Sequence, residues 1–272
     1  YSLYCLYIQS LDLMQFDHFA AAATSPELSR PVLCIVLVMA AFIAAFYGLE
    51  AVARTASVIA LLMIAAIVFL TVCLLPDMKR LHFPPLFYGG VTPILTGALE
   101  SLPRFLELGL IALLVPYVKG VGKGLSAGVL FSTAVVLVMQ ATLVGVLGDY
   151  NEMVTYPYYT AATLAQSSLI QRLDILVTAV WLAGIFVKMS LMAVIFLGCM
   201  RQAFGDKWKL LYVSAGGAAV LAVGLLLGDR MLEAEYGFLW VISMSLLLLF
   251  AVALPVILLG ANALRERRAK AE

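Results

Sequence analysis

The stretch VTPILTGALESLPRFLELGLIALLVPYV, from Val91 to Val118, is long and apolar enough to cross a membrane, yet it contains three prolines and two glycines. Proline removes a backbone donor and clashes one turn back, so we expect a discontinuous helix here. Irregular backbone at membrane depth is tolerated only where it is buried in protein or lines a cavity. An interrupted helix of this kind predicts a ligand site near the middle of the membrane.

The composition of the whole chain agrees with a membrane setting. Of its 272 residues, 64% are hydrophobic and 12% charged, and the mean hydropathy is +1.06. A soluble domain exposes far more polar surface, so we predict a single transmembrane domain over residues 1–272 that contacts membrane lipid. Lys and Arg total 17 against 16 Asp and Glu, a balance that gives no support to nucleic acid as a partner.

Apolar runs separated by charges, Pro and Gly predict eight spans of an all-α membrane protein. The predicted spans are 1–23, 31–47, 56–75, 91–118 (broken), 125–147, 175–200, 210–227 and 238–264. The segment 151–173 is too polar to span, and we expect an external amphipathic helix there. Two interpretations of this segment are about equally supported: a lid that gates the site, and an interfacial helix with no gating role.

Lys and Arg divide unevenly between alternate connections. The connections on one side of the membrane hold ten Lys and Arg residues, and those on the other side hold five. The ten include the basic residues that follow the last span. The positive-inside rule therefore predicts a cytoplasmic C-terminus. The chain begins at Tyr1 inside an apolar stretch, so we expect it to be the C-terminal part of a longer protein.

Two ionisable residues within predicted spans, Glu107 and Lys188, are the leading functional candidates, because charges inside a membrane are costly and usually functional. Glu107 can serve as a ligand, proton or cation site, or it can only form an internal ion pair with Arg104, three residues before it. Lys188 can bind a ligand or replace a metal cation, or it can be a fixed partner of Glu107 or of backbone carbonyls.

Other candidates lie on the same segments. Trp181 and Gly184 precede Lys188 by seven and four residues and share its helical face. Gly184 allows close helix contact, while packing is the simpler role for Trp181 and for Tyr4 and Tyr7 in the first span. The predicted ligand site comprises Tyr4, Tyr7, Gly97, Pro103, Phe105, Glu107, Trp181, Gly184 and Lys188.

No motif supports enzymatic chemistry, a metal site or a cofactor. The chain has no nucleophile elbow, phosphate-binding loop or paired metal motif, and His18 and His82 stand alone. The four cysteines lie singly in apolar runs, as small core residues do.

Three stretches resemble one family, the B subunits of GerA-type spore germinant receptors, a branch of the amino acid/polyamine/organocation transporter superfamily. They are YGLEAVART (Tyr47 to Thr55), TPILTGALESLPRFLELGLIALLVPYV (Thr92 to Val118) and QRLDILVTAVWLAGIFVKMSLMAVIFLG (Gln171 to Gly198). With the connecting spans, the resemblance covers essentially the whole chain.

The resemblance implies ten spans in a LeuT-like arrangement of two inverted repeats, of which the eight here are the third to the tenth. It also implies a subunit in the inner membrane of the spore that recognises a nutrient, usually an amino acid, and signals germination together with an A subunit and a lipoprotein C subunit. One departure concerns Glu107, since the family has Pro, an aromatic residue and Gly before its glutamate. Here the sequence is Pro103, Arg104, Phe105, Leu106.

Two other hypotheses remain open. A proton-coupled amino acid permease would use Glu107 as its coupling carboxyl group. The missing start of the chain also allows a decayed gene product with no working site.

Overall fold

The computed structural model describes residues 1–23, 29–83, 89–118, 120–164, 173–231, 244–246, 248–257 and 260. Every regular element in this part of the chain is helical, as the sequence predicts. The α-helices are α1 (Ser2–Ala23), α2 (Arg30–Tyr47), α3 (Leu49–Leu74), α4 (Thr92–Leu106), α5 (Val121–Leu147), α6 (Pro157–Leu164), α7 (Leu173–Phe204) and α8 (Lys209–Met231). Short 3-10 segments are η1 (Leu75–Asp77), η2 (Arg80–His82), η3 (Glu107–Tyr117), η4 (Gly148–Glu152) and η5 (Asp206–Trp208), and η6 (Leu248–Ala253) is π-helical.

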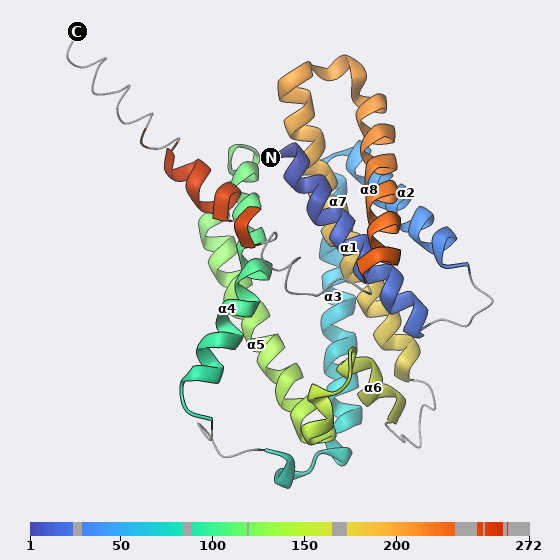
Figure 1. The fold of residues 1–272 in the computed structure, drawn as a ribbon, viewed down its shortest axis with the longest axis vertical. Helices are drawn as coiled ribbons and strands as arrows, with labels where there is room; N and C mark the ends of the chain where they lie inside the picture. The colour runs from blue at the N-terminus through green and yellow to red at the C-terminus, as the bar shows by residue number, and fades with distance from the viewer. Residues whose placement is uncertain are drawn as a thin grey trace.

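Helix α1 lies at the centre of the main bundle, packed against α7, α8 and α2 (Figure 1). Its buried face carries apolar side chains, Tyr4, Ile8 and Leu13 among them, and they join one core with α2, α7, α8 and η3. Unusually, the same helix also buries polar side chains, namely Gln9, Ser10 and Asp12. Buried polar side chains need hydrogen-bond partners, so a polar site can form along this face of α1.

Helices α2 and α3 follow each other with only Gly48 between them. Gly48 has φ +102, in the left-handed region that favours glycine, so the chain turns here without a loop. The helix begins at Leu49, seven residues before the predicted start of the third span at residue 56. The first turns of α3 include an ion pair four residues apart, with Arg54 Nη2 2.6 Å from Glu50 Oε1, and this spacing favours helix.

Helices α4 and α5 stand beside this bundle, and α5 reaches it at the end near α6 (Figure 1). A second, smaller core forms there from α3, α5, α6 and α7. Within the predicted external segment 151–173, α6 buries Ala161 and Ala162, while residues 165–172 lie outside the described part. Burial raises the pKa of Tyr158 in α6, although its hydroxyl group lies 3.4 Å from that of Thr71 and this bond acts in the opposite direction.

Five helical segments within the described ranges are long and apolar enough to cross a membrane. They are Arg30–Tyr47, Leu49–Asp77, Gly122–Glu152, Leu173–Phe204 and Asp206–Leu226. The chain is thus an integral multi-pass membrane protein. The full count of eight stays a prediction, since α1 and the 91–118 segment are less apolar and about half of 238–264 lies outside the described residues.

Candidate functional site

An ion pair joins the middle of α1 to the middle of α7. Lys188 Nζ lies 2.7 Å from Asp12 Oδ1 and donates a hydrogen bond to it. The Asp12 side chain is only 5% exposed, whereas that of Lys188 is 37% exposed. The carboxylate is therefore embedded between helices, and part of the Lys188 side chain remains exposed.

Asp12 is the functional candidate that the sequence reading missed. Among the alternatives for Lys188 was a fixed partner, Glu107 or freed backbone carbonyls, and the structure instead brings Asp12 to it across 176 positions of sequence. The side chain of Glu107 lies outside the described part, so its own partner stays a prediction. An acid in a membrane-embedded helix needs a cation as much as Lys188 needs an anion, but the other polar residues of α1 made Asp12 inconspicuous in the sequence.

An aromatic cluster lies one to two turns along α1, and two turns along α7, from this ion pair. Trp181 of α7 stacks on Phe16 of α1, with ring centroids 6.1 Å apart, and tilts against Phe19 at 4.2 Å. Phe19 in turn meets the edges of Tyr156 and Tyr159 at 5.1 and 5.9 Å. Trp181 thus packs directly against the helix that carries Asp12.

Gly184 and the two tyrosines of α1 occupy packed positions. A Cβ at Gly184 would meet Cε of Met63 at 3.2 Å, so this glycine lets α3 approach α7 closely. Tyr4 is buried and stacks on Phe250, with centroids 4.9 Å apart, and Tyr7 is partly buried against the same core. These residues surround the bundle interior in which the ion pair lies.

The interrupted segment changes winding directly before Glu107. The α-helical part, α4, ends at Leu106, and 3-10 winding continues from Glu107 to Tyr117. Leu110 and Leu114 of η3 are buried in the main core with α1 and α7. Gly97 lies on an exposed part of α4, and nothing lies within 4 Å of a Cβ built there.

The other two predicted site residues of this segment, Pro103 and Phe105, have side chains outside the described part. Tyr4, Tyr7 and Trp181 belong to one core, Gly184 lies against Met63 of α3, and Gly97 lies apart on α4. The remaining assignments on the segment stay predictions.

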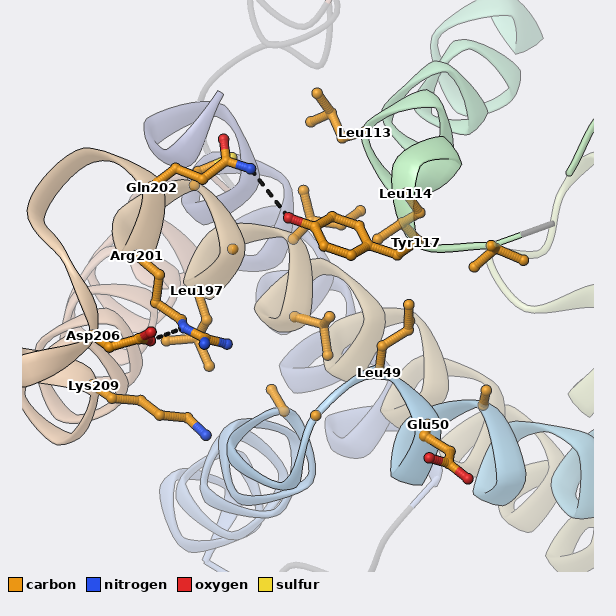
Figure 2. A pocket seen from close by; sticks show the side chains of 18 residues that line it. Leu49, Glu50, Leu113, Leu114, Tyr117, Leu197, Arg201, Gln202, Asp206 and Lys209 are labelled. Atoms are coloured by element: carbon orange, nitrogen blue, oxygen red, sulfur yellow. Dashed lines mark hydrogen bonds and ion pairs between the residues drawn. The ribbon is translucent and has the colours of Figure 1, made fainter.

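A cavity of about 710 Å³ opens at the end of the bundle that the Lys and Arg distribution predicts to be cytoplasmic. Its lining comes from α2, α3, η3, α7, η5 and α8. Leu49, Leu114 and Leu197 give it an apolar floor (Figure 2). Its inner wall reaches Val194, six residues and about 9 Å along α7 from Lys188.

Polar side chains line part of the cavity, and two pairs of them are bonded (Figure 2). Gln202 Nε2 donates to the Tyr117 hydroxyl group at 3.2 Å and so ties η3 to α7. Arg201 pairs with Asp206. Lys209 Nζ donates to the Phe46 carbonyl at 2.6 Å and so ties α8 to α2.

Tyr117→Phe is expected to speed alkylation of Cys199, which lines the cavity, by a membrane-permeant maleimide. The substitution removes the bond between η3 and α7, worth about 0.5–1.5 kcal/mol, so the rate should rise about two- to tenfold. The measurement is labelling in a Cys73→Ser background, because Cys5 and Cys34 are buried. Tyr150→Phe, exposed on η4 and outside the cavity lining, is the control. Equal labelling rates in the two variants would show that this bond does not close the cavity.

These features define a multi-helix membrane protein with an acid–ammonium pair between two of its helices. Residues 1–230 match the family described as spore germination protein, and the chain belongs to that family. Comparisons with curated proteins and with solved structures give no match.

Proposed function

We propose that this protein is the membrane subunit of a spore nutrient-germinant receptor, which binds an amino acid or similar small nutrient and signals germination. The observation that carries the proposal is the Asp12–Lys188 ion pair in the interior of a spore germination protein. Charges at this depth are costly and are retained for binding or coupling.

The proposed ligand site lies between α1 and α7, with Tyr4, Tyr7, Trp181, Gly184 and Lys188 around it. Glu107, with the preceding Pro103 and Phe105, is proposed to complete it from the interrupted segment, and Gly97 gives that segment freedom to bend. Ligand binding would act by favouring one of two arrangements of this segment. The receptor would include an A subunit and a lipoprotein C subunit in the inner membrane of the spore, with the C-terminus of this chain in the cytoplasm. A LeuT-like inverted repeat is the architecture proposed for the full-length subunit.

The test of this function is a deletion of the gene in the spore-forming host. Spores without the protein should lose or slow germination with at least one nutrient, measured as the fall in optical density of the suspension. Membrane vesicles bearing the full-length protein should show no uptake of radiolabelled amino acids. Normal germination of the deletion strain with every nutrient would overturn the proposal.

A second candidate is a proton-coupled amino acid permease, which the cavity at the predicted cytoplasmic end favours, since a permease needs an exit on that side. Uptake driven by a proton gradient in the same vesicles would establish it.

Glu107→Gln is expected to abolish the nutrient response while the protein still inserts, because the carboxyl group at the change of winding can no longer carry charge. The measurement is germination against nutrient concentration, with immunoblotting of spore membranes to check the protein level. Glu100→Gln, on the exposed face of α4, is the matched control and should respond normally. If Glu107→Gln and Lys188→Ala both respond with unchanged concentration dependence, the site assignment is wrong.

A further inference from the structure

We infer that the ligand is a zwitterion, recognised by insertion into the Asp12–Lys188 ion pair: its ammonium group binds the Asp12 carboxylate and its carboxylate binds the Lys188 ammonium group. This inference rests on the proposed function and adds Asp12 to the binding residues. It specifies which chemical groups the ligand must carry, an ammonium group and a carboxylate.

The exposure of the two partners supports this exchange. Lys188 Nζ and Asp12 Oδ1 are in contact at 2.7 Å, so the pair is satisfied before a ligand arrives. The Lys188 side chain is 37% exposed, against 5% for Asp12, so an incoming carboxylate would approach the pair along Lys188. A zwitterion leaves both the Asp12 carboxylate and the Lys188 ammonium group paired, whereas a ligand with one charge leaves one of them without a counter-ion.

The surroundings of Asp12 provide a further acceptor for an ammonium group. Gln9 lies one turn before Asp12 on α1 and is 0% exposed. Its Nε2 donates to the Cys5 carbonyl at 3.2 Å, and its Oε1 has no hydrogen-bond partner among the described residues. A buried amide oxygen without a donor is unfavourable, and an ammonium group offers three donors.

The walls beyond the ion pair are apolar and aromatic. Phe16 follows Asp12 by one turn, and it stacks on Trp181. Ile185 and Met189, on either side of Lys188, are buried. A ligand with charged groups at one carbon and an apolar remainder fits this arrangement, which describes an α-amino acid.

The experiment uses spores carrying the complete receptor, exposed first to an equimolar mixture of the twenty common L-amino acids and then to single compounds. For L-alanine the matched analogues are propanoate, which lacks the ammonium group, and ethylamine, which lacks the carboxylate. Each analogue is expected to need about a hundredfold or higher concentration for a half-maximal response, because a site built for a polar group rejects ligands that lack it. The same comparison applies to any other amino acid that proves active.

The variant for this test is Asp12→Asn/Lys188→Met. It removes both charges, so neither residue is left as a charge without a counter-ion. It is expected to insert at the wild-type level and to lose the amino acid response. The control is Asp17→Asn/Arg30→Met, which removes a second ion pair of α1, at 3.6 Å, and should respond normally.

The outcomes separate this inference from the proposed function. Full response of an analogue, or of the Asp12→Asn/Lys188→Met variant, would overturn the exchange. If deletion of the gene removes the response to a nutrient that is not a zwitterion, the receptor function stands and the inference is wrong. If the deletion changes nothing, the receptor function itself fails.

Discussion

Lys188→Met is expected to lower the free energy of unfolding by about 3–5 kcal/mol, the range typical of breaking a buried ion pair by removing one partner. The loss arises at Asp12, because its side chain is only 5% exposed and keeps its charge between the helices after the ammonium group is gone. The measurement is unfolding of the purified protein in detergent micelles, followed by helical circular dichroism.

Two further variants identify the ion pair as the cause. Asp12→Asn/Lys188→Met should recover most of the loss, since neither charge is then stranded in the interior. Arg30→Met should cost under about 1 kcal/mol, because Arg30 is 50% exposed and its ion pair with Asp17 lies near the surface. Equal destabilisation of the single and double variants at positions 12 and 188 would mean that lost packing, rather than a stranded charge, is responsible.

Gly216→Ala is expected to destabilise the bundle by about 1–3 kcal/mol through overpacking. A Cβ at this position would lie 2.6 Å from Cε1 of Phe196 and 2.9 Å from Cε1 of Phe42. Both rings are buried, with exposures of 4% and 2%, so neither can swing aside into open space. The added methyl group must therefore push α8 away from α2 and α7, which would appear as a lower melting temperature in detergent.

The adjacent glycine provides the matched control. A Cβ at Gly217 would come no closer than 3.7 Å to Cγ1 of Val38, an ordinary contact distance. Gly217→Ala should leave stability unchanged or raise it by about 0.5–1 kcal/mol, since alanine loses less backbone entropy in a helix. A Gly216→Ala variant as stable as Gly217→Ala would show that the Phe42 and Phe196 rings adapt freely.

Helix type and approximate position could be predicted from hydropathy, because a membrane-spanning helix must satisfy its backbone hydrogen bonds internally and therefore shows as a long apolar run. The boundaries were less predictable. The predicted third span starts seven residues after α3 begins, because Arg54 was assigned to a connection between spans. In the structure Arg54 forms an ion pair with Glu50 on the first turns of the helix.

The candidate site was predictable only in part, for a physical reason. Lys188 stands out because a single charge in an apolar run is conspicuous, and Trp181 and Gly184 follow from helical spacing. Asp12 sits in a less apolar helix with other polar residues, so nothing local distinguishes it. Its importance comes from contact with Lys188, a long-range contact that one sequence does not reveal.

The central place of α1 has a consequence for biogenesis. During synthesis α1 emerges long before α7, so Asp12 must wait for its counter-ion until 176 further residues have been made. Burial of that carboxylate can therefore be completed only late, and α1 would remain at the translocon or the lipid boundary until α7 arrives. Truncations that stop before Lys188 should then leave α1 accessible to reagents from the aqueous side.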